Sequence, residues 1–412
     1  MRRRVLLVLS LLASWAHAKP MEVDEGGEIK RTGNAGLSEA FNRTINLDRS
    51  TSLRIAYPNA RFLYIQFSKF DLPHGASLTL TTNESTVMYT GKGKSHTAHD
   101  TAFYSDRLVG SAVDIVYKRH HDTSKTHGFG ITISSYIRGI PRVDLDTKSA
   151  LTNPACVNKR PVWRPAVCFQ EEAPRVFESS RALARMVTLG ASSQYATGFL
   201  AGCDGYFLTN EHNVRTQEQV DATDFGFLAA SARCDDTCNH LALGCAPKLL
   251  LRGAATLVAV DTTLDYTLLR FDHAARRQFQ ALGVPHLPLR HRSRAVVGET
   301  IYIVQHPDGT AAKIVTQLRS GSDAVVSDVD VTNKCGKHQV GYAAETIGGA
   351  SGSPVLATRD HRVIGLHHCG ECNVETSTEG AALRTAIPIH DILADLKKKR
   401  IDLPACFTMR HG

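Results

Sequence analysis

The chain has 412 residues, of which 42% are hydrophobic and 21% charged, and its formal net charge is +8. This length and aliphatic content support two or three globular domains with real cores and exclude a disordered chain. The first four residues supply three of the positive charges, and the remaining excess matches no nucleic-acid-binding pattern, so we expect no nucleic acid partner.

The N-terminus predicts secretion. Arginines at positions 2 to 4 precede an apolar run from Val5 to Ala13, and Ala16-His17-Ala18 is a small-x-small cleavage site. We therefore predict a signal peptide over residues 1–18 and an extracellular protein. The apolar run is about half the length that spans a bilayer, and the later apolar stretch 241–260 is interrupted by charged residues, so no membrane anchor is expected.

Residues 19–145 show the period-two apolar pattern of half-buried strands, separated by turn signals. The pattern predicts a small antiparallel β-sandwich of CUB-like or jelly-roll character. Sequons at Asn42 and Asn83 predict glycosylation of this domain, although either can be unused. No binding site is evident, and a protein or glycan ligand stays open. The alternating positions are Leu63, Ile65 and Phe67; Leu78 and Leu80; Val113, Ile115 and Tyr117; Phe129, Ile131 and Ile133.

All ten cysteines follow residue 150, which indicates a domain boundary. In a secreted chain their even number predicts disulfides, with the connectivity left open. Residues 146–179, rich in Pro, Lys and Arg and containing Cys156 and Cys168, are interpreted as a disulfide-tethered linker. The alternative for His367-His368-Cys369-Gly370-Glu371-Cys372 is zinc. An oxidising compartment favours disulfides, so we expect no metal and no cofactor.

From residue 180 to 412 short apolar runs alternate with Gly and Asp turns, which predicts the barrels of an all-β protein. One helix is clear at the end of the chain. Residues Ile389 to Lys399 place Ile389, Ile392, Leu393 and Leu396 on one face, and the basic residues that follow suit a helix C-terminus.

Three motifs in this region predict nucleophilic catalysis. Ser351 lies in a glycine-flanked loop, and glycines there let backbone N–H groups turn toward a developing oxyanion. A serine hydroxyl also needs a base, and His212 follows an apolar strand. Asp265 comes directly before another apolar strand. The order His, Asp, Ser is that of chymotrypsin-type enzymes, and not of subtilisin or the α/β-hydrolases.

The region from 180 to 400 resembles the trypsin-like serine peptidases, closest to the microbial glutamyl and lysyl endopeptidase branches. The resemblance implies a chymotrypsin-like double β-barrel in which Ser351 is the nucleophile, His212 the general base and Asp265 the acid that orients it. The N–H groups of Gly349 and Ser351 would form the oxyanion hole. The matching stretches are Thr197-Gly198-Phe199-Leu200, Leu208-Thr209-Asn210-Glu211-His212, Asp265-Tyr266-Thr267-Leu268-Leu269, Gly349-Ala350-Ser351-Gly352-Ser353-Pro354 and Val363-Ile364-Gly365-Leu366-His367.

Some details depart from the pattern or leave alternatives. Asp261 is the nearest competitor for the acid role, but no comparable strand follows it directly. Asn213 and Ala196 stand where many relatives carry a disulfide, which leaves the role of Cys203 unexplained.

Substrate specificity is expected to depend on Glu345 and His367. Glu345 lies six residues before the nucleophile, where trypsin places the acid that binds Lys and Arg side chains, so cleavage of protein or peptide substrates after Lys or Arg is predicted. His367 resembles the histidine with which glutamyl endopeptidases hold an acidic side chain, which leaves Glu specificity as an alternative. A further alternative, from another class, is a catalytically silent peptidase-like binding or inhibitory protein.

Overall fold

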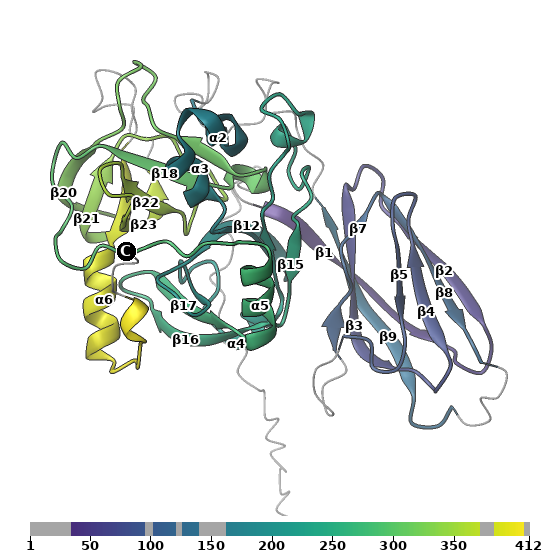
Figure 1. Ribbon diagram of the computed structural model, residues 1–412. Helices are drawn as coiled ribbons and strands as arrows, with labels where there is room; N and C mark the ends of the chain where they lie inside the picture. The colour runs from purple at the N-terminus through teal and green to yellow at the C-terminus, as the bar shows by residue number, and fades with distance from the viewer. Residues whose placement is uncertain (1–33, 95–101, 121–125, 140–161, 371–382, 408–412) are drawn as a thin grey trace, which may run out of the picture. The chain divides into compact units, whose positions relative to one another are not determined.

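The computed structural model describes residues 34–94, 102–120, 126–139, 162–370 and 383–407. The predicted signal peptide, Cys156 and Cys372 lie outside these residues. Antiparallel strands make up most of the regular structure in Figure 1, which confirms the all-β prediction.

The N-terminal strands form two sheets that share one core. In β9 every second residue is buried, from Ile131 to Gly139, as the alternation in the sequence predicts. Phe129, which the same pattern placed in this strand, precedes it and is 36% exposed. One sheet has the order β2-β8-β4-β5, and β1, β9, β3 and β6 are neighbours in the other. The strands are β1 (Asn34–Ile45), β2 (Thr51–Ala56), β3 (Phe62–Asp71), β4 (Ser77–Thr81), β5 (Thr86–Tyr89), β6 (Phe103–Tyr104), β7 (Leu108–Val109), β8 (Ala112–Lys118) and β9 (Gly130–Gly139).

The apolar core of this sandwich confirms the predicted faces. Leu63, Ile65 and Phe67 of β3 pack with residues of β4 and β8 in one buried cluster. Asn42 and Asn83, the two sequon asparagines, are exposed. β1 also pairs with β12 (Ser192–Leu200), at Leu37 opposite Ser192, so this sheet continues into the first barrel.

The first barrel is built from seven strands around an aromatic core. Phe207, Phe225 and Phe271 contact one another edge to face at centroid distances of 5.3–5.6 Å. Figure 1 shows α5 beside these strands. The elements are β11 (Leu183–Thr188), β12 (Ser192–Leu200), β13 (Tyr206–Thr209), α4 (Gln217–Asp221), β14 (Thr223–Phe227), η2 (Thr237–His240), β15 (Leu249–Leu251), β16 (Ala255–Asp261), β17 (Tyr266–Phe271) and α5 (His273–Ala281).

The second barrel follows the order β10-β19-β18-β22-β23-β24-β21-β20. Its interior holds Ile303, Tyr342 and Val355, while a further buried cluster joins residues of both barrels. The elements are β10 (Arg164–Pro165), β18 (Ile301–Gln305), η3 (Pro307–Gly309), β19 (Lys313–Val315), β20 (Val326–Asn333), β21 (Gly336–Tyr342), β22 (Pro354–Ala357), β23 (Val363–Gly370), β24 (Arg384–Pro388), α6 (Ile389–Lys398) and η4 (Ala405–Phe407). The double barrel and its C-terminal helix α6 are as predicted.

The range interpreted as a linker contains regular structure at its C-terminal end. η1 (Ala166–Cys168), α2 (Phe169–Glu172) and α3 (Pro174–Ser180) bury Phe169 and Val176 in the cluster shared by the barrels. Cys168 pairs with Cys234, which ties this segment to the first barrel. The domain boundaries themselves stay a prediction.

Three more disulfides lie within the described residues. Cys203 pairs with Cys406, which gives Cys203 the role that the sequence left open. Cys238 pairs with Cys245, and Cys335 with Cys369. Because Cys369 is oxidised in this disulfide, it is not a thiolate ligand of the kind that the zinc alternative needs.

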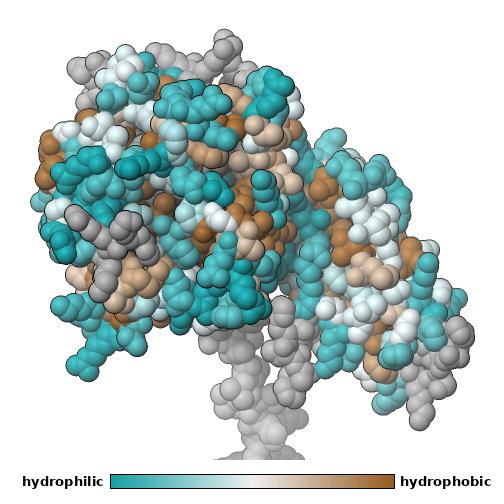
Figure 2. All heavy atoms as spheres, viewed as in Figure 1, coloured by the Kyte–Doolittle hydropathy of each residue, from teal (hydrophilic) through white to brown (hydrophobic). Residues whose placement is uncertain are grey.

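The described surface mixes polar and apolar side chains. Figure 2 shows polar residues over most of one face with apolar ones between them, which is usual for a globular protein. The described part of the chain contains no helix long and apolar enough to cross a membrane.

We expect the Cys203–Cys406 disulfide to stabilise the fold more than Cys238–Cys245 does. The first joins residues 203 apart and the second residues 7 apart, and loop-closure entropy grows with that separation. Replacing both cysteines by serine should lower the free energy of unfolding by about 3–5 kcal/mol for Cys203–Cys406 and by about 2 kcal/mol for Cys238–Cys245. Denaturant unfolding measures both, and equal losses would contradict the loop-closure argument.

Candidate active site

His212 and Asp265 are brought together by the pairing of two strands. β13 ends at Thr209, which lies opposite Thr267 at the start of β17. His212 follows the first strand by three residues and Asp265 directly precedes the second. The antiparallel register therefore places both side chains at the same end of the first barrel.

His212 and Asp265 are joined by two hydrogen bonds, one between the side chains and one from the His212 backbone. His212 Nδ1 lies 2.8 Å from Asp265 Oδ2, and the backbone N–H of His212 donates to Asp265 Oδ1 at 3.0 Å. The Asp265 side chain is 16% exposed and that of His212 is 40% exposed. The imidazole is therefore held in one orientation while its outer edge stays accessible.

Asp265 is an ionised acid in an unusual backbone conformation. Burial raises the pKa of its carboxyl, but hydrogen bonds from His212 and His368 outweigh burial and hold the pKa well below its usual range. Its φ of 43° lies in the left-handed region, where Asp is tolerated better than most residues. Asn210 donates to the Asp265 carbonyl at 2.9 Å and helps to hold this conformation.

The loop around Ser351 consists of two consecutive turns with glycine in the third position. Ala350 N–H donates to Ile347 O, and Ser353 N–H donates to Ala350 O, both at 3.0 Å. Gly349 has φ 90° and Gly352 φ 87°, as the third residue of a type II turn requires. A Cβ on Gly352 would lie 2.0 Å from a backbone oxygen, so no other residue fits there.

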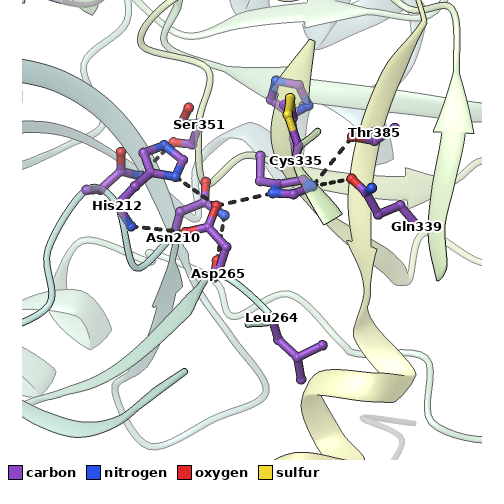
Figure 3. A network of polar contacts seen from close by, with 12 residues as sticks. Asn210, His212, Leu264, Asp265, Cys335, Gln339, Ser351 and Thr385 are labelled. Carbon is purple, nitrogen blue, oxygen red and sulfur yellow. Dashed lines mark hydrogen bonds and ion pairs between the residues drawn. A yellow bond between two sulfur atoms is a disulfide. The ribbon is translucent and has the colours of Figure 1, made fainter. Parts of the chain in front are cut away.

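Two donors fix the backbone of Ser351. Its carbonyl oxygen accepts the N–H of Thr197 at 2.9 Å and the side-chain amide of Asn213 at 3.2 Å. Asn213, at the position where many relatives carry a half-cystine, thus joins the His212 turn to the serine loop. Figure 3 shows Ser351 beside the His212 ring, so the structure brings the three predicted residues together.

The peptides that flank Gly349 and Ser351 have fixed orientations. Gly348 O accepts the N–H of Asp308 at 2.7 Å, and Ala350 O is occupied by the turn. In a trans peptide the N–H points away from the C=O, so the N–H groups of Gly349 and Ser351 point away from these acceptors. Within the described residues neither N–H has a hydrogen-bond acceptor. Both are available to an oxyanion.

Asp261 is engaged elsewhere. Lys399 Nζ lies 2.8 Å from its Oδ2, and its other oxygen accepts the N–H groups of Thr263 and Leu264, each at 2.9 Å. This aspartate closes the β16–β17 turn and binds the end of α6.

His368 contacts Asp265, and sequence reasoning missed it. Its Nδ1 lies 3.2 Å from Asp265 Oδ2, and its side chain is 2% exposed. The sequence placed His368 only in the zinc alternative. Two adjacent histidines after the apolar run 363–366 were the signal that could have identified it.

Glu345 and His367 are both occupied by protein groups. Arg319 Nε lies 2.5 Å from Glu345 Oε1, and the N–H of Val162 donates to Oε2 at 3.1 Å. The Nδ1 of His367 lies 2.7 Å from the Tyr342 hydroxyl. Burial, followed by the nearby charges of His368, Arg384 and His212, holds the pKa of His367 well below its usual range, so this ring is neutral near pH 7.

Arg384 is a second residue that the sequence did not identify. It is 8% exposed, its Nε donates to Thr346 Oγ1 at 3.1 Å, and its stem covers Gly370 on the neighbouring strand. Burial lowers the pKa of its guanidinium without removing the charge. A cation therefore lies next to the residue that follows Glu345.

Comparisons with known proteins agree with this fold. Residues 196–366 match the family model of the trypsin-like peptidase domain. A curated relative, secreted RxLR effector protein 73 of Plasmopara viticola, is 33% identical over 243 residues, which are 59% of this chain and 55% of that protein. The chain thus spans about half the length of this relative.

Solved structures align more weakly. A variant of the HtrA-type protease AlgW with a tripeptide has 16% identity and a TM-score of 0.40, over 56% of this chain and 63% of that one. A serine endoprotease from Yersinia pestis has 17% identity and a TM-score of 0.38, over 55% of this chain and 65% of that one. The fold defined by the barrels and by the family match is that of a trypsin-like serine peptidase.

Proposed function

We propose that this chain is a serine endopeptidase that hydrolyses peptide bonds through His212, Asp265 and Ser351. The observation that carries the proposal is the double hydrogen bond from His212 to Asp265 beside a glycine-flanked Ser351. A serine, a histidine and a buried carboxylate in this arrangement are the parts that acyl transfer requires.

The proposed roles follow from the contacts. Ser351 Oγ attacks the scissile carbonyl carbon and its proton passes to His212 Nε2, while Asp265 stabilises the imidazolium that forms. The tetrahedral oxyanion accepts the N–H groups of Gly349 and Ser351. His212 then gives its proton to the leaving amine, which releases the C-terminal product. A water molecule, deprotonated by His212, hydrolyses the acyl-serine ester and restores the hydroxyl.

We also propose that the protein is secreted. The N-terminal signal pattern supports this, and so do four disulfides, which persist in oxidising compartments. The name of the curated relative describes a secreted protein. Peptides and proteins are the proposed substrates. Glycosylation at Asn42 and Asn83, and a protein or glycan ligand of the N-terminal sandwich, remain proposals from the sequence.

Another class of function is a catalytically silent peptidase-like binding or inhibitory protein. The curated relative is named an effector, a name that states no peptidase activity. The two proposals differ in turnover, which protein or peptide substrates in the presence and absence of a serine-directed phosphonofluoridate measure directly. Hydrolysis that stops when Ser351 is labelled supports the endopeptidase.

A basic side chain of the protein itself occupies Glu345, the residue predicted to bind Lys or Arg at P1 of the substrate. Because Arg319 is paired with Glu345, a basic substrate side chain must displace it. We expect Glu345→Gln to lower kcat/KM for Lys peptides roughly tenfold, because a hydrogen bond to a charged group contributes about the free energy of a tenfold change. Arg319→Gln should raise kcat/KM for the same peptides, because it removes the competing cation. Arg359→Gln, which removes an exposed arginine paired with Glu299, is the matched control.

The Glu alternative is supported by Arg384, which lies beside Thr346 and carries the opposite charge. Peptides with Lys, Arg, Glu and Leu at P1 separate the two. If Glu peptides are preferred and Arg384→Gln removes the preference, the pocket selects acids and the assignment of Glu345 as the P1 acid is wrong.

A further inference from the structure

A second histidine shares the carboxylate of the candidate triad. Asp265 Oδ2 contacts His212 Nδ1 at 2.8 Å and His368 Nδ1 at 3.2 Å. On its other side, His368 Nε2 lies 2.5 Å from Gln339 Oε1 on β21 and 3.4 Å from Thr385 Oγ1 on β24. Figure 3 shows this chain of contacts from His212 through Asp265 to Gln339.

The orientation of the Gln339 amide is fixed by groups that can only accept. Its Nε2 lies 3.0 Å from Asn333 Oδ1 and 3.5 Å from the backbone oxygen of Val331. Asn333 Oδ1 also accepts the backbone N–H of Cys335 at 2.9 Å, so this atom is an oxygen and not the amide nitrogen. Gln339 therefore presents its NH₂ group to Asn333 and its oxygen to His368.

Both sides of the His368 ring then face acceptors. Asp265 Oδ2 belongs to an ionised carboxylate, and Gln339 Oε1 is an amide oxygen. A ring with a single proton would direct a lone pair at one of these oxygens, which leaves a buried polar contact unsatisfied. The Thr385 hydroxyl does not decide the matter, because it can donate or accept.

From this geometry we infer that His368 is an imidazolium that positions Asp265. The inference rests on the proposed endopeptidase function. His368 holds Oδ2 from the second barrel, while the His212 backbone holds Oδ1 from the first, so the carboxylate is fixed at both oxygens.

The charged and titratable groups around His368 come from each packed element. Asp265 of the first barrel contacts His368 directly and also holds His212, His367 is its neighbour on β23, and Arg384 on β24 acts together with His368 on the pKa of His367. Within the described residues Asp265 is the carboxylate in hydrogen-bond contact with His368.

Two substitutions of His368 test whether it positions Asp265. His368→Ala removes the donor to Asp265 and is expected to lower kcat roughly 10- to 100-fold with little change in KM, since misplacement of a catalytic group costs about this much. His368→Asn keeps a short neutral donor. It should therefore recover most of kcat, which separates the positioning contact from a general loss of packing.

The control is His338→Asn, on the β20–β21 hairpin that also carries Gln339. His338 is 76% exposed, and its φ of 56° suits asparagine, so kcat should not change. Unchanged kcat in His368→Ala would exclude a positioning role.

A spectroscopic measurement separates this inference from the proposed function. In full-length Ser351→Ala protein labelled with ¹⁵N-histidine, the signals lost in His368→Asn identify His368. Both of its ring nitrogens should carry protons near neutral pH. One protonated nitrogen overturns the imidazolium whether or not the wild type hydrolyses peptides. If both ring nitrogens of His368 carry protons but the wild type does not hydrolyse peptides, the imidazolium is supported and the proposed function fails.

Discussion

Ser351→Ala and His212→Ala are each expected to lower kcat for peptide hydrolysis by about 10⁴- to 10⁶-fold. Without the hydroxyl no acyl-enzyme forms, and without the imidazole the hydroxyl keeps its proton. Because the two residues act on one proton transfer, the double variant should be no slower than the worse single variant. Active-site titration with a phosphonofluoridate and steady-state assays measure both effects.

The matched control for Ser351 lies two residues further along the same loop. The Ser353 hydroxyl is buried, and no described group bonds to it, so Ser353→Ala removes one oxygen and no hydrogen bond. We expect wild-type kcat from Ser353→Ala. The three single variants Ser351→Ala, His212→Ala and Ser353→Ala should all unfold at temperatures close to that of the wild type. Wild-type turnover in Ser351→Ala would overturn the proposed function.

The sequence predicts the candidate triad because each residue sits in a local motif. Gly349 and Gly352 are each the third residue of a turn, and Ser351 lies between them. His212 and Asp265 adjoin strands that are visible as apolar runs. Strand patterns and turn signals along the chain predict the barrels of an all-β protein, whereas the double barrel was implied by the resemblance to the trypsin-like serine peptidases.

The sequence could not predict contacts that join distant segments. His368 reaches Asp265 only when β23 lies against the first barrel, and Gln339 and Thr385 complete its surroundings from two further strands. The Arg319–Glu345 pair likewise joins residues 26 positions apart, and no local periodicity records it. A charge was visible at position 345, but its partner was not.

Disulfide connectivity shows the same limit. Ten cysteines allow too many pairings for spacing to choose among them. Cys203 pairs with Cys406 because the C-terminal segment after α6 returns to the start of β13. The sequence predicts that disulfides form, and the fold selects the partners.

Asp265→Asn is expected to lower kcat by about 10⁴-fold at neutral pH while the protein stays folded. Asparagine has the same shape and tolerates the positive φ of 43°. However, the carboxylate accepts three N–H groups: the His212 backbone N–H at Oδ1, and the two imidazoles at Oδ2. An amide supplies only one oxygen.

The backbone N–H of His212 cannot reverse its polarity, so the asparagine oxygen must face it and the NH₂ group must face the rings. His212 Nδ1 then becomes the acceptor and its proton moves to Nε2, the atom that must receive the proton of Ser351. Catalysis fails because the base is in the wrong tautomer, although every side chain keeps its place. The matched control is Asp261→Asn, which weakens the contact to Lys399 and should leave kcat within about threefold, because exposed ion pairs contribute little. If Asp261→Asn loses activity and Asp265→Asn retains it, the acid of the triad is Asp261, and the network through His368 plays no part in catalysis.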